Sequence, residues 1–353
     1  MTVNDFSCGD EALFRYLRAL PKAELHLHME GAIRPELLLR LAERNKLRLP
    51  FSYADEYPNL CVYKTFQNFA NLLLMGVHCL RQLQDFFDVI IDLGNSLAHE
   101  NIRYAEVTWT PQFYLSRPFP LESILEALDE ARRQVKVRLG IEIRWIPDLV
   151  RSFPAPAWVI TNWAVSDKAR AAGVVALGLG GPEAGYPAGG FSQCFRYAQS
   201  RGLPANPHAG ENAGPASVWE TIEQLSPLRL GHGVRSVEDE RLVAYLAEQA
   251  IPLEICLTSN IKLGVYASYP EHPVKKLIDA GCVVALNSDD PILFQTTLTE
   301  EYMHAIQDCG LGVVDIKKCI LAALVSSYST ESDKLRMLEE FKDEFIKLDA
   351  ESG

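Results

Sequence analysis

The amino-acid sequence predicts an α/β protein built as a (β/α)8 TIM barrel. Eight short apolar, β-rich runs occur along the 353 residues, and amphipathic helical patterns separate most of them. Strands that alternate with helices run parallel and are joined by crossovers, and eight such units are the number that closes a barrel. An open doubly wound sheet is the alternative fold, but no GxGxxG motif follows the first run.

The expected strands are short runs rich in branched and aromatic side chains, and most of them end in polar residues or glycine. In chain order they cover residues 24–30, 103–109, 142–149, 174–180, 204–211, 229–233, 252–259 and 283–290. Between them, apolar residues recur at the spacing of an amphipathic helix. The clearest helical patterns cover residues 35–45, 121–139, 218–225, 239–249 and 273–280.

Two segments are longer than a simple barrel requires. Residues 50–102 separate the first two strands, so we expect extra helices inserted after strand 1, above the barrel mouth, as a lid. Residues 296–353 follow the last strand and are expected to form C-terminal helices that pack outside the barrel. No linker, repeat or low-complexity tract divides the chain, so residues 1–353 are expected to form a single domain.

Composition argues against several classes of protein. The net charge is -12 and Lys and Arg do not cluster, so neither nucleic acid nor an anionic membrane is the expected partner. No apolar run reaches about 18 residues, and the first residues show no signal-peptide pattern. The eight cysteines include no CxxC pair, which suits a reducing compartment. We expect a cytoplasmic protein with a small-molecule partner; the oligomeric state stays open, a homo-oligomer included.

Polar residues that can bind metals or move protons lie at the ends of four expected strands. His26 and His28 are separated by one leucine, so their side chains share one face of the first strand. Alone, such a pair is more often packed core than a metal site. Comparable residues end the fifth, sixth and eighth strands, namely His208, Glu211, His232, Asp289 and Asp290. The C-terminal ends of barrel strands meet at one mouth, so we expect these side chains to lie together.

Six motifs connect the chain to a known family. They are LPKAELHLHMEGA (20–32), YAEVTWTPQ (104–112), HAGENAGP (208–215), LGHGVRSVED (230–239), LEICLTSN (253–260) and ALNSDDP (285–291). In this combination the chain resembles the adenosine deaminase family within the metal-dependent amidohydrolases, over nearly its whole length. The resemblance implies a barrel enzyme that replaces the 6-amino group of a purine by oxygen.

The resemblance implies one zinc ion per chain, held by three histidines and one aspartate. The implied ligands are His26, His28, His208 and Asp289. Neutral imidazoles and a carboxylate suit Zn²⁺, which lowers the pKa of a bound water from about 16 to about 7. Two-metal relatives often use a lysine on the fourth strand, and residues 174–180 contain none, so we expect a single metal.

The resemblance also implies three catalytic residues. Glu211 is the expected proton donor to ring N1, a role that requires a raised pKa in a dry pocket. His232, between two glycines that free the backbone to aim it, is expected to take or steer the proton of the attacking water. Asp290 is expected to hydrogen-bond the attacking hydroxide, and Glu106 is a candidate for orienting the metal ligands. The reaction needs no organic cofactor.

Substrate contacts are expected from Asp290 and from four other residues. The backbone of Gly181 would face purine N3, because a glycine allows close approach to the ring. Phe66 and Phe69 would form an apolar wall over the base. Glu30 stands where many family members carry an aspartate that touches the ribose, and it is one methylene longer.

The sugar side of the expected pocket departs from the family pattern, since Gly178 and Pro182 replace acidic residues. The leading hypothesis is zinc-dependent hydrolytic deamination of adenosine or an adenosine-like nucleoside. Free adenine, or a modified nucleoside such as aminodeoxyfutalosine, is the alternative substrate. Two other classes stay open: hydrolysis of an amide or phosphoester at the same metal, and a non-catalytic binding barrel. The presence of every expected ligand and of the acid disfavours the last.

Overall fold

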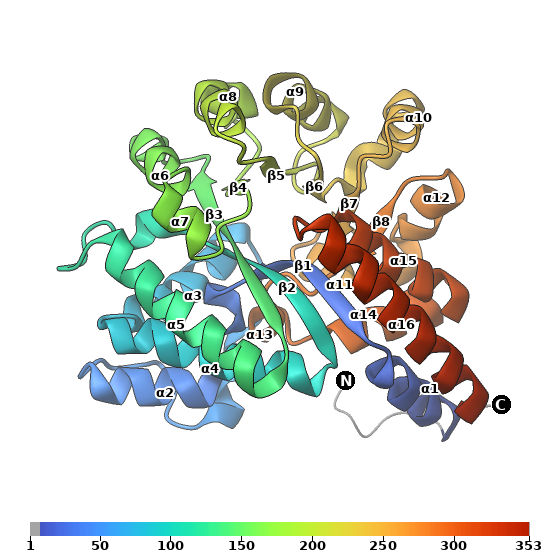
Figure 1. Cartoon of the computed structure of the whole chain (residues 1–353), viewed down its shortest axis with the longest axis horizontal. Helices are drawn as coiled ribbons and strands as arrows, with labels where there is room; N and C mark the ends of the chain where they lie inside the picture. Colours follow the sequence, from blue (N-terminus) through green and yellow to red (C-terminus); the bar gives the residue numbers. More distant parts are fainter. Residues whose placement is uncertain (1–7, 353) are drawn as a thin grey trace.

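The structure is a computed structural model that describes residues 8–352, and it confirms the predicted (β/α)8 barrel (Figure 1). Eight parallel strands follow one another around a single sheet in chain order, with helices outside them. The strands are β1 Lys22–His28, β2 Ile102–Trp109, β3 Glu142–Val150, β4 Leu177–Gly180, β5 Ala205–Ala209, β6 Leu230–His232, β7 Leu253–Ile255 and β8 Val284–Leu286.

The barrel closes just after β8, at a residue predicted to bind the metal. The backbone N–H of His28 donates to the carbonyl of Asp289 at 2.8 Å, and the N–H of Asp289 donates to the carbonyl of His26 at 3.1 Å. The side-chain oxygen of Asn287 accepts from the N–H groups of Leu25 and His26 at 2.8 and 3.1 Å. Closure of the barrel therefore places Asp289 beside the two histidines of β1.

Several predicted strands, among them the fifth and the eighth, end earlier or begin later than the sequence indicates, and two of them show the reason. The run 252–259 contributes only β7, because helix α11 (Leu257–Lys262) begins two residues after the strand ends. The run 174–180 contributes β4 and, before it, a single bridge between Val174 and Trp145. Both runs are almost wholly buried, and a short apolar run does not reveal where a strand gives way to a helix.

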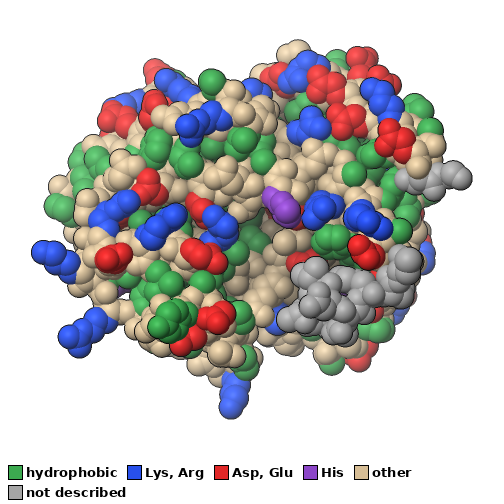
Figure 2. All heavy atoms as spheres, turned by 90° about the horizontal axis from the view of Figure 1, so that it is seen from below, with side chains coloured by type: hydrophobic (Ala, Val, Ile, Leu, Met, Phe, Trp, Pro, Cys, Tyr) green, Lys and Arg blue, Asp and Glu red, His purple; other side chains and the backbone are tan. Residues whose placement is uncertain are grey.

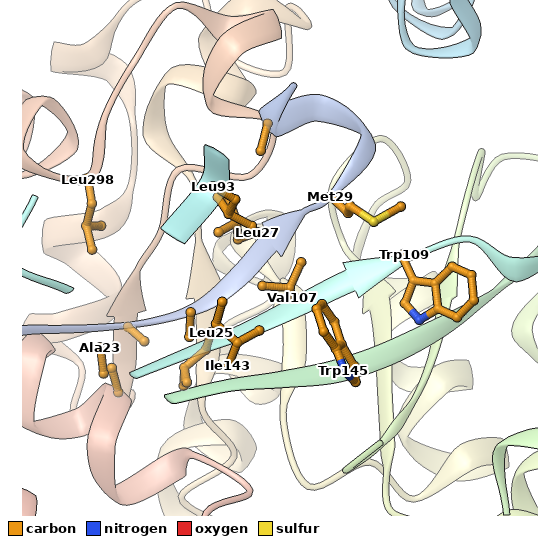
Figure 3. Close-up of a cluster of buried hydrophobic side chains, with 14 of the residues drawn as sticks. Ala23, Leu25, Leu27, Met29, Leu93, Val107, Trp109, Ile143, Trp145 and Leu298 are labelled. Atoms are coloured by element: carbon orange, nitrogen blue, oxygen red, sulfur yellow. The ribbon is translucent and has the colours of Figure 1, made fainter. Parts of the chain in front are cut away.

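Apolar side chains of β1 anchor it to the outer helices, which fixes the direction of its histidines. Leu25 and Leu27 are buried with Leu93 in one cluster between β1 and the helical layer (Figure 3). Because side chains alternate along a strand, His26 and His28 point to the inner side of the barrel. The same alternation therefore builds the core and aims the candidate ligands.

The helices match the predicted positions and include the expected additions. The longer ones are α1 Cys8–Ala19, α2 Pro35–Arg44, α3 Phe66–Cys79, α4 Leu83–His99, α5 Leu121–Leu139, α6 Ala157–Ala164, α8 Ser192–Ser200, α9 Pro215–Leu225, α10 Glu240–Glu248, α14 Leu298–Gln307, α15 Val313–Ser326 and α16 Glu331–Ser352. Shorter ones are α7 Asp167–Ala171, α12 Val274–Asp279 and α13 Pro291–Phe294.

The insertion after β1 divides into two parts. Helix α4 packs against α5 and β2, so it is an ordinary outer helix of the barrel. Helix α3 instead contributes side chains to the cavity at the barrel mouth. The part of the insertion that covers the cavity is therefore α3. After β8, helices α14 to α16 occupy the C-terminal segment as predicted.

The surface and the cysteines agree with the composition. Figure 2 shows acidic, basic and apolar side chains mixed across one face of the molecule. The cysteine side chains that the structure describes form no disulfide, and the side chain of Cys8 lies outside the described residues. None of the helices between residues 8 and 352 has both the length and the apolar character needed to cross a bilayer.

Candidate active site

The four predicted metal ligands meet at the C-terminal mouth of the barrel. Nε2 of His28 lies 3.2 Å from Nε2 of His208. Oδ1 of Asp289 lies 3.5 Å from Nε2 of His26 and 3.4 Å from Nε2 of His28. The structure thus brings side chains from β1, β5 and the end of β8 to one point, as the sequence predicts.

The chemistry of this cluster suits a bound cation. Nε2 of His26 is buried and has no hydrogen-bond partner among the described residues. Burial lowers the pKa of His26, but hydrogen bonds and charges from Asp289 and Glu254 outweigh it and raise the pKa to about 10. Burial lowers the pKa of His28 to about 4 and that of His208 well below its usual value, so both rings are neutral. The neutral rings of His28 and His208, and the negative charges of Asp289 and Glu254 around His26, fit Zn²⁺.

Two of the site residues adopt left-handed backbone conformations. Asp289 has φ 65° and His232 has φ 59°. Non-glycine residues rarely adopt this conformation, which costs about 1–3 kcal/mol unless the surrounding structure imposes it. Such strain often occurs at functional sites, and two of the seven described non-glycine residues with positive φ belong to the cluster.

Two glycines make room for the site residues. A Cβ atom on Gly31 would overlap the carboxylate of Asp290, and one on Gly231 would lie 2.8 Å from Cε1 of His26. The sequence interpretation assigned the glycines around His232 to backbone freedom. This holds for Gly233, which has φ 69°, whereas the role of Gly231 is to leave space for the histidines of β1 and β5.

The three predicted catalytic residues surround the cluster of candidate metal ligands. Nε2 of His232 lies 3.9 Å from Oε1 of Glu211 and 3.9 Å from Oδ2 of Asp289. Burial raises the pKa of Glu211 to about 8, so this group carries a proton at neutral pH. Burial and the adjacent Asp289 also raise the pKa of Asp290, whereas burial lowers that of His232 to about 4. A neutral acid and a neutral base beside a group of candidate metal ligands can together move protons.

The cluster forms the inner end of a cavity of about 240 Å³. The walls include Gly181 and, from α3, Phe66 and Phe69. Phe66 is 39 % exposed and lies at the outer part, whereas Phe69 is buried and stacks on Phe294 with ring centres 5.2 Å apart. The predicted apolar residues therefore do line the cavity, with the polar groups at its inner end.

Glu30 is the predicted substrate-binding residue that the structure places apart from the cavity lining. Its Oε1 accepts from the backbone N–H of Thr110 at 3.1 Å and from the hydroxyl of Tyr114 at 3.0 Å. Burial raises its pKa to about 7. In this conformation Glu30 supports the wall that carries Thr110, and it does not reach the cavity as the sequence interpretation expects.

The structure adds a buried ionic network behind the cluster. Nδ1 of His26 lies 2.9 Å from Oε2 of Glu254 on β7, and Arg229 joins Glu254 to Glu106 through two ion pairs. The Nδ1 proton of His26 is thereby directed to Glu254, which leaves Nε2 free for a ligand. The sequence interpretation named Glu106, but Glu254 is the residue in contact; its charge within an apolar strand was the available signal.

A second residue outside the prediction organises the loop that carries the candidate acid. The buried carboxylate of Glu183 accepts from the N–H groups of Gly210 and Glu211, both at 2.8 Å, and from the hydroxyl of Ser217 at 2.5 Å. These bonds fix the chain just after β5. The signal in the sequence was a single acidic residue in the glycine-rich stretch 178–190.

The site agrees with comparisons to known proteins. A family model described as adenosine deaminase matches residues 21–344. Adenine deaminase of Bordetella avium is 36% identical over 88% of this chain and 98% of its own. Aminodeoxyfutalosine deaminase of Streptomyces avermitilis is 35% identical over 93% of this chain and 92% of its own. The crystal structure of adenine deaminase from Arthrobacter aurescens has a TM-score of 0.87 at 28% identity, covering 93% of this chain and 99% of its own.

Proposed function

The chain belongs to the adenosine deaminase family and is a hydrolytic deaminase of adenine-like or adenosine-like substrates; within this class, we propose that it converts a 6-aminopurine nucleoside to the 6-oxopurine and ammonia. The observation that carries the proposal is the meeting, at one cavity, of His26, His28 and His208 with Asp289 beside them and with the buried carboxyl group of Glu211. Metal-dependent hydrolysis requires both elements within reach of the reacting carbon.

We assign the cluster to one zinc ion. Its ligands would be the side chains of His26, His28, His208 and Asp289. Zinc bound there would lower the pKa of a water molecule and polarise the reacting centre. The support is the convergence of the ligand atoms, the free Nε2 of His26 and the absence of a lysine from β4.

The surrounding residues divide the proton transfers among them. Glu211, protonated below about pH 8, donates its proton to N1 of the purine as water oxygen adds to C6. His232 accepts the proton that the water loses, and Asp290 holds the attacking oxygen by a hydrogen bond. His232 then returns its proton to the amino nitrogen, the bond from C6 to that nitrogen breaks and ammonia leaves, while the proton of the C6 hydroxyl passes to the Glu211 carboxylate and the 6-oxopurine remains.

The substrate assignment rests on the extent of the cavity. It continues from the cluster to the partly exposed side chains of Phe66 and Leu74, which leaves room for a substituent on the purine. Phe66 and Phe69 would cover the base, and the backbone of Gly181 would face N3. The likeness to an adenine deaminase favours free adenine as the second candidate, and the likeness to aminodeoxyfutalosine deaminase favours a modified nucleoside.

A steady-state comparison tests the proposal. Ammonia release by zinc-loaded protein is measured with adenosine, aminodeoxyfutalosine and adenine, and with chelator-stripped protein as the control. A kcat/KM at least tenfold higher for one of the nucleosides than for adenine supports the proposal. A preference for adenine would overturn the nucleoside assignment, and no turnover of any of the three would overturn the reaction. Two metal ions per chain by atomic spectroscopy would contradict the single zinc site.

A further inference from the structure

One buried carboxyl group in the cavity has no part in the proposed reaction. Asp148, on β3, lines the cavity although its side chain is only 3 % exposed. Its Oδ1 atom is buried and accepts no hydrogen bond from any residue between 8 and 352. A buried polar atom without a partner costs free energy, so its presence in a binding cavity points to a ligand.

The neighbouring strand is built to admit this carboxyl group. Asp148 pairs with Gly178 in the register between β3 and β4. A Cβ atom on Gly178 would overlap Oδ1, and one on Gly180 would lie 2.5 Å from Oδ2. Two glycines on β4 therefore leave the space that the carboxyl group occupies, and any larger residue at either position would displace it.

The charges of His26 and Arg151 act on Asp148, but no residue that the structure describes forms an ion pair with it. The nearby guanidinium of Arg151 is engaged elsewhere, since it donates to the carbonyls of Tyr186 at 2.9 Å and His208 at 2.7 Å. Burial raises the pKa of Asp148 well above its usual value. A buried carboxyl group with a raised pKa offers an acceptor and, when protonated, a donor at the same point.

The position beside a metal ligand indicates which part of the substrate is in reach. A Cβ atom added to Gly180 would lie 2.5 Å from Oδ2 of Asp148 and 4.0 Å from Cε1 of His208. Asp148 and His208 therefore both lie next to the same glycine. The carboxyl group is thus at the inner end of the cavity, where the reacting ring must enter, and the sugar would extend toward the outer end.

We propose that Asp148 is a substrate-binding residue that recognises the purine ring through hydrogen bonds to its ring nitrogens. This inference rests on the proposed function, which brings a 6-aminopurine to the inner end of the cavity. It adds a contact from β3 to those expected from Gly181, Glu211 and Asp290. Because the ring is common to nucleosides and to the free base, the contact would serve both.

The test compares activity and stability in the same variants of the zinc-loaded protein. Asp148→Leu should lower kcat/KM about tenfold for both adenosine and adenine, the effect of losing one hydrogen bond. Asp148→Asn keeps the shape and both hydrogen-bonding groups and should recover most of that loss. Because neither substitution removes a partnered group, the melting temperature of Asp148→Asn should stay constant or rise.

Asp85→Asn is the matched control for stability. The carboxylate of Asp85 is also fully buried, but it accepts hydrogen bonds from Arg44 and Asn45, each at 2.8 Å, and it does not line the cavity. The Asp85→Asn substitution should lower the melting temperature and leave kcat/KM of the folded protein unchanged. Comparison of the two variants distinguishes a carboxyl group that contributes to substrate binding from one that contributes to stability.

Several outcomes would overturn the inference. One is an unchanged kcat/KM in Asp148→Leu. Another is a loss of kcat/KM for adenosine alone, which would place the contact at the sugar. The third is a melting temperature that falls in Asp148→Asn as much as in Asp85→Asn. If Asp148→Leu does not fold, Asp148→Ala is held to the same activity criterion. Failure of the wild-type protein to deaminate any 6-aminopurine would instead refute the proposed function, so the two failures are distinguishable.

Discussion

Replacement of Glu254 by glutamine is expected to weaken zinc binding without removing any proposed ligand. Burial raises the pKa of Glu254, but Arg229 and His26 outweigh it and lower the pKa to about 2, so the group is a carboxylate at neutral pH. It lies 2.9 Å from Nδ1 of His26. The bond fixes the ring and its tautomer and increases the basicity of Nε2.

The expected magnitude follows from this contact. Loss of a carboxylate that orients a metal-binding histidine typically lowers metal affinity 10- to 100-fold, which corresponds to about 1.4–2.7 kcal/mol. Glutamine has nearly the shape of glutamate, so the packing of β7 is retained. The buried Arg229 loses one of its two carboxylate partners, so stability also falls, by up to about 3 kcal/mol.

The assay is a zinc competition titration with a chromophoric chelator, combined with thermal unfolding of the metal-free protein. Glu106→Gln is the matched control, because Glu106 pairs with the same Arg229 but not with His26. Both variants should lose stability, and only Glu254→Gln should lose zinc affinity by tenfold or more. A zinc affinity for Glu254→Gln within threefold of wild type, or an equal loss in Glu106→Gln, would refute the reasoning.

Three further predictions concern the reaction. Glu211→Gln should lower kcat by 10²- to 10⁴-fold while the zinc content stays at the wild-type value, and near-full activity would remove Glu211 as the proton donor. Burial raises the pKa of Glu211 to about 8, and the reaction uses the protonated form of this group. The value of kcat/KM should therefore stay constant below that pH and fall tenfold per pH unit above it. A pH profile that is flat to pH 10 would contradict this assignment. Gly31→Ala should lower kcat at least tenfold with zinc retained, because its Cβ would overlap the carboxylate of Asp290. Gly190→Ala is the control: apart from its chain neighbours, no residue that the structure describes has an atom within 4 Å of the position of its added Cβ, so its kcat should equal that of the wild type.

The order of elements could be predicted from the sequence because it depends on local patterns. The helix 121–139 was predicted with the bounds that α5 has, since its apolar face and its terminal Gly140 define it locally. The ends of β4 and β7 could not be placed in the same way. Their flanking residues are buried too, so no change from apolar to polar residues marks where the strand stops.

The candidate ligands could be named from the sequence because each lies at a strand end within a distinctive motif. Glu254, Glu183 and Asp148 could not be assigned in this way. Each contacts the site from a strand or loop that is distant along the chain, so its role depends on which partner the barrel places opposite it. Glu30 shows the converse, since its motif position suggested a substrate contact and Tyr114 and Thr110 hold it in the wall instead.

The sequence by itself determined the fold class, the family and the identity of the metal-ligand candidates, because strand alternation and residue chemistry are local properties. Only the tertiary structure decided which carboxyl groups are paired and which are free. That depends on the register of neighbouring strands and on burial. The ionic partner behind His26 and the unpartnered Asp148 beside the glycines of β4 therefore emerge only when the barrel is closed.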